Sequence, residues 1–431
     1  MVSSKSNSYL CRQTIQEGIV QNKRKTINDP VLGFNSLQSN LLFDLMEHPY
    51  FQRLRRIKQL GLSCMVYPGA NHTRFEHALG ATFLMQEALD TLKGKGVEIS
   101  DAEAEGALVA ILLHDIGHGP FSHALEYAIV DNLVHEDISL LLMQDLNSQF
   151  GGRLALGISI FQDMYHKPFL HQLVSSQLDV DRLDYLRRDS FYSGVAEGTI
   201  GADRLIKMMN VKDNQLVIEE KAIYSIEKFL ISRRLMYWQV YLHKTVLSAE
   251  ILLEKVLKRA KELALSGCDV FATPSLKVFL THHISLQHFK NNDQIEGRHL
   301  LDLFSSIDDN DIISSIKEWQ SHPDFILSHL AKSIINRHLF KVVMQSDAID
   351  GIWLEEVGAK IKLSYGLNDQ ELSYFLIQRE FTNKAYIAHD NNIKLLMKSG
   401  EVKELSTASD ISLSNLSQVV RKQICCFASY M

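Results

Sequence analysis

The hydrophobic positions between about residues 35 and 265 recur mainly at the spacing of amphipathic α-helices. Apolar residues at this spacing begin at Leu41 and continue beyond Pro49. Further helices are predicted over 71–95, 101–116, 120–131, 135–149, 153–165, 168–178 and 181–190, and a long helix over 221–265. A polar turn between β-branched residues at 211–218 instead predicts a small hairpin.

Beyond about residue 266 the pattern becomes mixed. Helices are predicted near 296–305, 309–318 and 351–363, and strands over 340–344, 372–379 and 393–398. We therefore predict a mainly α protein in three parts. Residues 1–24 form a disordered lead-in, 25–265 a helical domain, and 266–431 a smaller α+β region that we expect to serve subunit contacts.

Composition narrows the class of protein. The chain has 431 residues, of which 46% are hydrophobic and 22% charged, as in soluble globular proteins. It lacks both an apolar run of about 18 residues and a signal-peptide pattern, so we expect no membrane association. Five scattered cysteines without a Cys-x-x-Cys pair favour a reducing, cytoplasmic setting. A net charge of −6 argues against a nucleic-acid partner.

The densest group of titratable residues follows the apolar run 106–113, in Leu-Leu-His-Asp-Ile-Gly-His-Gly-Pro-Phe-Ser-His at 112–123. Imidazole and carboxylate groups are the ligands of divalent cations of intermediate hardness, so this segment is interpreted as half of a metal site. Candidate companions are His77 in Arg-Phe-Glu-His and Asp181 in the acidic and basic segment 179–189. On a helix, Asp181, Asp184, Tyr185, Arg188 and Asp189 share one face. The alternative for that segment alone is a solvated helix with surface ion pairs.

The ordered set of motifs resembles the HD phosphohydrolase superfamily, and within it the deoxynucleoside triphosphate triphosphohydrolase branch. The set comprises the segments 51–61, 68–70, 74–77, 114–123 and 179–189, and the resemblance spans about residues 25–250. It implies an HD-domain helical core, homo-oligomers (dimers or tetramers), and hydrolysis of a dNTP to a deoxynucleoside and inorganic triphosphate. Two alternatives remain open: an HD-type nucleotide phosphomonoesterase or phosphodiesterase, and a non-catalytic nucleotide sensor.

The resemblance also implies a set of catalytic residues. One divalent ion (Mn, Fe, Ni, Co, Zn or Mg) would be held by His77, His114, Asp115 and Asp181. Asp115 would also position the attacking water, and His118 would contact phosphate. His123 is the first candidate for the proton donor to the leaving oxygen, and His135 the second.

Matched positions further imply residues that bind the dNTP substrate. Arg74 and Arg233 would neutralise the triphosphate, and Asp189 would accept a hydrogen bond from the 3′-hydroxyl. The sugar would lie against four further residues, namely Gln59, Leu60, Tyr185 and Tyr241. The alternative for Tyr241 is a core aromatic. Tyr237 is also expected to contact the substrate, at a position near the base and phosphates where the human member of the branch has a histidine. Base preference is therefore less defined than reaction type.

Relatives in this branch bind regulatory nucleotides between subunits. The positions that match such sites are Lys25, Asn28, Gln52, Arg55 and Lys244. The alternative for the basic run 53–58 is a solvated helix face. Acidic residues Glu219 and Glu220 stand where basic residues would help to hold a phosphate, so nucleotide activation is a hypothesis.

Overall fold

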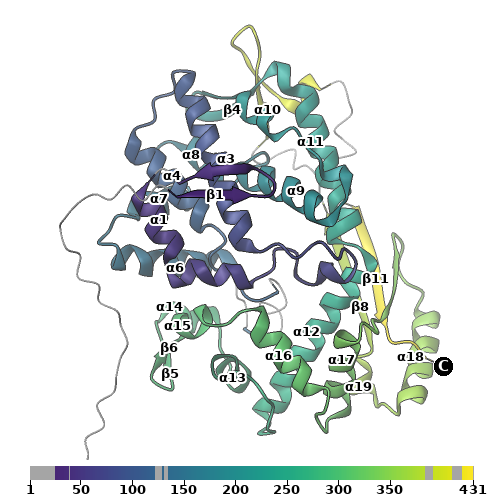
Figure 1. Ribbon diagram of the computed structural model, residues 1–431. Coiled ribbons are helices and arrows are strands. Elements are labelled where there is room, and N and C mark those ends of the chain that lie inside the picture. Colours follow the sequence, from purple (N-terminus) through teal and green to yellow (C-terminus); the bar gives the residue numbers. More distant parts are fainter. Residues whose placement is uncertain are drawn as a thin grey trace, which may run out of the picture.

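The computed structural model describes residues 25–37, 39–121, 129–130, 134–383, 392–409 and 420–430 (Figure 1). The predicted fold class is confirmed: the protein is mainly α-helical, with a few small sheets. The helices up to residue 265 are α1 (Asn40–Glu47), α2 (Pro49–Gln52), η1 (Arg53–Arg56), η2 (Gly61–Met65), α3 (Arg74–Gly94), α4 (Asp101–Leu113), α6 (His135–Gln149), α7 (Ala155–Phe161), α8 (Pro168–Val174), α9 (Val180–Ser193), η3 (Ala196–Gly198), α10 (Ala202–Lys207), η4 (Glu220–Ala222), α11 (Ile223–Met236), η5 (Tyr237–Tyr241) and α12 (Lys244–Leu265).

The later part of the chain alternates short helices and strands, as predicted. Its helices are α13 (Pro274–Thr281), α14 (Leu286–Lys290), α15 (Leu300–Ser305), α16 (Asp309–Trp319), α17 (Phe325–Ile335), α18 (Gly351–Tyr365), α19 (Asp369–Leu372) and α20 (Leu405–Ala408). The strands of the whole described chain are β1 (Thr26–Asp29), β2 (Gly33–Ser36), β3 (Met209–Lys212), β4 (Gln215–Glu219), β5 (Gln294–Ile295), β6 (Arg298–His299), β7 (Lys341–Gln345), β8 (Leu376–Asn383), β9 (Lys394–Leu396), β10 (Val402–Glu404) and β11 (Val420–Phe427).

Helix α3 is the centre of the N-terminal helical core. It packs against both α4 and α9, and α7 covers another side of α4. Most α3 residues are buried, and so are nearly all residues of α4. Both helices begin with a capping box, in which the N-cap hydroxyl and a glutamate three residues later satisfy the first free N–H groups. The core therefore packs around α3, and the capping boxes fix the N-terminal ends of α3 and α4.

The described residues form four small sheets, and one of them joins distant parts of the chain. The predicted hairpin at 211–218 is confirmed as β3 and β4, which pair antiparallel. Its turn residues Asp213 and Asn214 have φ values of 51° and 61°, which suit a two-residue hairpin turn. Strand β9 then pairs parallel with β4, so the C-terminal chain extends the hairpin into a four-stranded sheet in the order β10-β9-β4-β3.

Helix α12 packs against the C-terminal elements. It contacts α13, α17 and β7, while β7, β11 and β8 form an antiparallel sheet beside it (Figure 1). Ser248 of α12 donates a hydrogen bond to the carbonyl oxygen of Phe340, just before β7. The C-terminal region is therefore closely packed on the helical domain.

One helix that the sequence predicts as continuous is interrupted. The long helix expected over 221–265 is interrupted by the π-helical turn η5 and by an extended His243, with φ −63° and ψ 131°. The His243 ring accepts a hydrogen bond from Thr245 N and caps α12. Apolar periodicity over 221–265 does not reveal a π turn, because the turn is a short bulge inside an otherwise helical pattern. The predicted helix 120–131 and the lead-in 1–24 lie largely or wholly outside the described residues.

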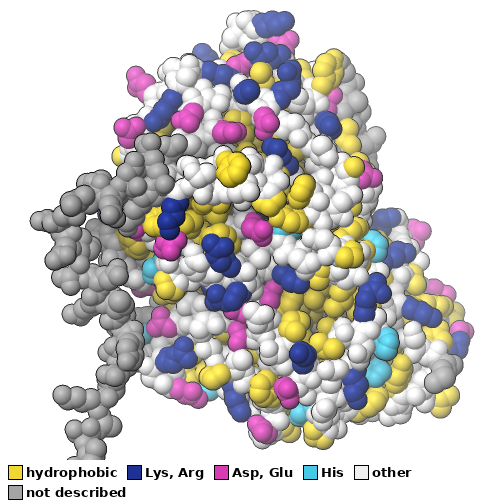
Figure 2. All heavy atoms as spheres, viewed as in Figure 1, with side chains coloured by type: hydrophobic (Ala, Val, Ile, Leu, Met, Phe, Trp, Pro, Cys, Tyr) yellow, Lys and Arg dark blue, Asp and Glu magenta, His cyan; other side chains and the backbone are white. Residues whose placement is uncertain are grey.

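On the face shown in Figure 2, acidic and basic side chains are interspersed. None of the described helices is long and apolar enough to cross a membrane.

Candidate metal centre and adjoining cavity

Three helix ends bring the four predicted metal ligands together. His77 lies in the first turn of α3, and Asp181 in the first turn of α9. His114 ends α4, and Asp115 follows it directly. Asp179 caps α9 by accepting a hydrogen bond from Arg182 N, which fixes the direction in which α9 starts.

The ligand atoms of these side chains are close to one another. His77 Nε2 lies 3.0 Å and His114 Nε2 3.4 Å from Asp181 Oδ1. Asp115 completes the group, with Oδ1 3.4 Å from His114 Nε2 and Oδ2 3.8 Å from His77 Nε2. The two imidazole nitrogens and Asp181 Oδ1 therefore meet at one point, and Asp115, which also groups with His118 and His135, adjoins it.

Both imidazole rings are oriented so that Nε2 faces this point. His114 Nδ1 donates to the carbonyl oxygen of Ile111 at 2.6 Å, which places the proton on Nδ1. His77 Nδ1 lies 2.8 Å from Asp184 Oδ2. Both Nε2 atoms are buried and face the Asp181 carboxylate. Metal-binding histidines are held in this way by a second partner on the other ring nitrogen, so these residues fit a divalent metal ion.

The electrostatics of the group favour a cation. Burial lowers the pKa of His77, but hydrogen bonds to Asp181 and Asp184 outweigh it and raise that pKa to about 10. Burial raises the pKa of Asp181, yet hydrogen bonds with His114 and His77 bring it below its usual range. Burial likewise opposes ionisation of Asp115, and His114, His118 and Arg74 hold its pKa well below the ordinary value. The carboxylates are therefore ionised at neutral pH.

A buried chain of ion pairs supports His77 from behind. Arg188 donates to both oxygens of Asp184, each at 2.8 Å, and also contacts Asp29 Oδ2 at 2.9 Å. The side chains of Asp184 and Arg188 are fully buried. A Cβ atom on Gly80 would lie 2.1 Å from both Arg188 Nη2 and Asp184 Oδ1. Because Gly80 has no side chain, the ion pair packs directly against the backbone of α3.

The segment after Asp115 places the other catalytic candidates. His118 Nε2 lies 3.3 Å from Asp115 Oδ1, and the His118 ring stacks on His135 at 3.7 Å between centroids. Burial, followed by the charge of Arg74, lowers the pKa of His118 to about 3, so this ring is neutral. His123, the first candidate for the proton donor, lies outside the described residues.

Two side chains fix this segment to the rest of the protein. The fully buried Arg53 donates to the carbonyl oxygens of His118 at 2.8 Å and Ile307 at 3.2 Å. Asp309, which begins α16, accepts from the backbone N–H groups of Phe121 and Lys58, both at 2.9 Å. The C-terminal region thereby holds the histidine segment in place.

A cavity of about 370 Å³ adjoins the metal ligands. Arg74 lines it and also donates through Nη1 to Asp115 Oδ2, so one guanidinium joins the cavity to the metal centre. Its other walls come from η2 and its flanks, η5, α12 and β8. The lining residues given a substrate role from the sequence are Gln59, Leu60, Arg74, Tyr237 and Tyr241.

Tyr241 is held in the cavity wall by buried polar groups. Its hydroxyl donates to Asp189 Oδ2 at 2.7 Å, and Asp189 Oδ1 lies 2.7 Å from His72 Nε2. Both oxygens of Asp189 therefore already have a protein partner. The ring centroids of Tyr185 and Tyr241 are 6.3 Å apart, and Tyr185 also faces the His77 ring at 6.4 Å.

Two arginines extend the site on the α9 and α11 side. The Nε atoms of Arg182 and Arg233 are buried and have no hydrogen-bond partner among the described residues. Burial raises the pKa of Tyr185, and the charges of Arg182 and Arg233 oppose that shift, which places both cations near this ring. Arg233 Nη1 also lies 3.5 Å from Gln177 Oε1.

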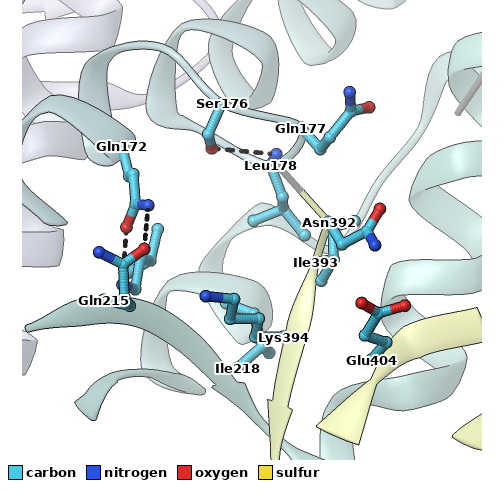
Figure 3. Close-up of a pocket in the computed structure, with 11 residues that line it drawn as sticks. Gln172, Ser176, Gln177, Leu178, Gln215, Ile218, Asn392, Ile393, Lys394 and Glu404 are labelled. Carbon is cyan, nitrogen blue, oxygen red and sulfur yellow. Dashed lines mark hydrogen bonds between the residues drawn. The ribbon is translucent and has the colours of Figure 1, made fainter. Parts of the chain in front are cut away.

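Gln177 belongs to a second cavity, of about 230 Å³, between α8, β4 and β9 (Figure 3). In Figure 3 the amides of Gln172 and Gln215 face each other, and the Gln172 amide donates to Gln215 Oε1 at 2.7 Å. The lining residues are Gln172, Ser176, Gln177, Leu178, Gln215, Leu216, Ile218, Asn392, Ile393, Lys394 and Glu404. The predicted metal ligands are not among them.

The residues expected at a regulatory nucleotide site are spread over several elements. Arg55 donates to Gln52 Oε1 at 2.9 Å and packs its guanidinium 3.5 Å from the centroid of Phe75. Lys25 lies over the Phe43 ring at 4.5 Å. Asn28 faces Phe34 across the β1–β2 pair, and Lys244 begins α12.

Sequence reasoning assigned no role to several residues that complete the site. Asp184 and Arg188 stood on the predicted polar face of α9, and their spacing from Asp181 was the available signal. His72 lies just before the Arg74–His77 motif. The cavity residues Glu254 and Arg379 are 125 positions apart and carry no sequence signal for their proximity.

The fold and site define a mainly helical protein with a buried His/Asp metal centre. The model of the HD domain matches residues 74–189, and that of the HD associated region matches residues 200–272. The chain belongs to the HD-domain family of metal-dependent phosphohydrolases.

Several relatives are similar over most of the chain. The uncharacterized protein YwfO of Bacillus subtilis is 33% identical over 405 residues, covering 90% of this chain and 88% of its own. The crystal structure of a phosphohydrolase from Bacteroides thetaiotaomicron matches with a TM-score of 0.90 and 50% identity, covering 94% of this chain and all of that one. The deoxynucleoside triphosphate triphosphohydrolase SAMHD1 of Homo sapiens is 31% identical over 264 residues, which are 51% of this chain and 42% of that protein.

Proposed function

We propose that this protein hydrolyses dNTPs to a deoxynucleoside and inorganic triphosphate. The observation that carries the proposal is the position of Arg74, which contacts the metal ligand Asp115 and also lines the 370 Å³ cavity. A substrate whose phosphates meet Arg74 therefore extends its nucleoside between Leu60 and Tyr241. Relatives named as triphosphohydrolases match about half of the chain and support this choice of substrate.

In this reaction water attacks the α-phosphorus, and the bond from that phosphorus to the 5′-oxygen breaks. The leaving oxygen takes up a proton, and the triphosphate departs with the oxygen of the water. A metal ion held by His77, His114, Asp115 and Asp181 would polarise a phosphate oxygen and lower the pKa of water at this site.

The protein side chains supply orientation and charge. Asp115 is an ionised acceptor that orients the attacking water. The buried Nε donors of Arg182 and Arg233, together with the charge of Arg74, favour an anionic triphosphate. His135 stacks on His118, is the more exposed of the two, and serves as proton donor together with, or in place of, His123.

The test is product analysis with purified protein. Each dNTP, singly and mixed, is incubated with Mn²⁺, Mg²⁺, Fe²⁺, Co²⁺, Ni²⁺ or Zn²⁺, and the products are separated by chromatography. We expect deoxynucleoside and intact triphosphate. Release of orthophosphate or pyrophosphate would contradict the proposal in favour of another HD activity, and binding without turnover would favour a nucleotide sensor.

Two variants connect that activity to the metal centre. His114→Ala removes a ligand whose partner is a backbone carbonyl, so we expect loss of bound metal and of turnover with little change in fold. His338→Ala is the matched control, because His338 is an exposed histidine outside the site. Retained turnover in a metal-free His114→Ala protein would contradict the mechanism.

We also propose a homo-oligomer with a regulatory nucleotide bound near Gln52 and Arg55, where a guanidinium is accessible. Faster turnover of one dNTP in the presence of a second nucleotide, accompanied by a change in molecular mass in solution, is expected. A simple hyperbolic dependence of rate on each dNTP, unaltered by the others, would contradict it.

A further inference from the structure

The wall of the 370 Å³ cavity that is farthest in sequence from the metal ligands is made by α12 and β8. Helix α12 contributes Leu247, Glu250, Ile251 and Glu254, which recur at helical spacing and so share one face. Strand β8 contributes Arg379 and Phe381, two residues apart and therefore on the same side of the strand. The C-terminal region, to which the sequence assigned no chemistry, thus forms part of the cavity.

Glu254 and Arg379 form an ion pair in this wall. Arg379 Nη2 lies 2.5 Å from Glu254 Oε1, and the two side chains are 32% and 16% exposed, respectively. This contact uses one carboxylate oxygen and one guanidinium nitrogen. A carboxylate accepts about four hydrogen bonds and a guanidinium donates five, so the pair retains capacity toward a ligand in the cavity.

The groups that line the cavity suit the different parts of a nucleotide. Arg74 marks the phosphate end because it touches Asp115. Tyr241, held by Asp189, lies in the wall expected to meet the sugar. In the same cavity Leu242 and Ile251 supply apolar surface, and Phe381 supplies an aromatic ring. A nucleobase attached to that sugar is placed against the α12–β8 wall.

We infer that the Glu254–Arg379 pair reads the nucleobase and favours guanine. The inference rests on the proposed function and adds its base preference. Side by side, the guanidinium of Arg379 offers a hydrogen-bond donor, and the carboxylate of Glu254 next to it offers two acceptors. The Watson–Crick edge of guanine offers the complement: the O6 acceptor followed by the N1–H and N2–H donors. Thymine offers acceptor, donor, acceptor, and adenine and cytosine begin with a donor, so each leaves at least one group mismatched.

The experiment compares kcat/KM for the four dNTPs in the wild-type protein and in Glu254→Gln. The substitution keeps the shape of the side chain but replaces one acceptor by a donor. We expect the preference for dGTP over dTTP to fall at least about tenfold, the discrimination typical of a bidentate base contact. The kcat/KM for dTTP is expected to change much less.

Glu262→Gln is the matched control. Glu262 lies two turns further along α12 and pairs with Arg259 at 3.5 Å, outside the cavity. It tests whether losing a glutamate–arginine pair on this helix is enough to alter specificity. An equal fall for all four substrates in Glu254→Gln, with a lower Tm, would assign the pair to structure and overturn base reading.

Binding of the product nucleosides separates this inference from the proposed function. The affinities of the wild-type protein for deoxyguanosine and thymidine are measured by calorimetry without hydrolysis. Tighter binding of deoxyguanosine that disappears in Glu254→Gln supports base reading, even if no dNTP is hydrolysed. Equal affinities overturn it, even if dNTP hydrolysis is observed.

Discussion

The Nδ1 atom of His77 lies 2.8 Å from Oδ2 of Asp184, and both side chains are buried. This contact fixes the imidazole so that Nε2 faces Asp181 and Asp115. Because Arg188 holds both oxygens of Asp184, the position of one metal ligand of α3 depends on an ion pair of the adjacent helix α9. Metal binding and core packing are therefore coupled at this point.

Asp184→Asn tests that coupling. The amide cannot accept from both Arg188 and His77 as a carboxylate does, so we expect metal affinity to fall about 10–100-fold. Metal content after dialysis against a range of free metal concentrations measures the effect. Asp203→Asn serves as the control. Asp203 forms a surface ion pair with Arg187, which lies in α9 like Asp184. Unchanged metal affinity in Asp184→Asn would show that His77 is oriented without this carboxylate.

Gly80→Ala is expected to destabilise the protein through the same ion pair. The new Cβ would approach Arg188 and Asp184 to 2.1 Å, and the fully buried pair has little room to move. We expect a loss of about 2–4 kcal/mol in the free energy of unfolding, as for overpacking beside a buried charge network. Urea denaturation measures it.

Gly94→Ala provides the comparison within the same helix. Nothing lies within 4 Å of a Cβ at Gly94, at the exposed end of α3. The substitution is expected to be neutral or slightly stabilising, because alanine reduces the conformational entropy of the unfolded chain. Equal effects of the two alanines would contradict the role assigned to the space at Gly80.

The sequence was sufficient to predict most helices and the metal ligands, for different reasons. The capped, almost wholly apolar run of α4 leads directly to His114, so the helix and its ligand share one local signal. The resemblance then placed His77 and Asp181 together, although they lie 104 positions apart in the sequence. Local pattern could not predict the break between α11 and α12, since a single five-residue π turn is too short to stand out within a long apolar pattern.

Contacts made by the C-terminal region were beyond sequence reasoning. Arg53 lies in a basic run that is typical of a solvated helix, yet it is fully buried against backbone carbonyls of His118 and Ile307. Asp309 begins a predicted helix and also anchors Phe121. Such roles depend on tertiary packing between distant segments, and neither residue type nor periodicity encodes them.

Glu103, near the start of α4, makes stability depend on acid pH. Burial raises its pKa, but hydrogen bonds from Lys167, Ser100 N and Tyr165 outweigh burial and lower the pKa to about 2. Because the folded-state pKa lies below the ordinary value, this carboxylate stabilises the fold above about pH 4.5, and the contribution is lost as the pH falls toward 2. Allowing for solvent screening, we expect it to be worth about 2 kcal/mol at pH 7.

Glu103→Gln should therefore lower stability at pH 7 and flatten the loss of stability between pH 4.5 and 2. Denaturant unfolding at several pH values gives both quantities. Asp101→Asn is the control, because Asp101 lies in the same first turn and its side chain is fully exposed. The assignment fails if Glu103→Gln and Asp101→Asn have the same acid profile.

Tyr241 is expected to exclude ribonucleotides. Its ring lines the cavity, and the hydrogen bond to Asp189 prevents the ring from turning away, so with a sugar bound as proposed the ring would close the space beside C2′. Tyr241→Ala opens that space, and we expect the ratio of kcat/KM for GTP to that for dGTP to rise about tenfold. Tyr241→Phe keeps the ring but removes the hydroxyl, so KM should rise a few-fold while ribonucleotides stay excluded. The two variants thus separate the bulk of the ring from its hydrogen bond, and a ratio unchanged in Tyr241→Ala would mean that another group rejects the 2′-hydroxyl.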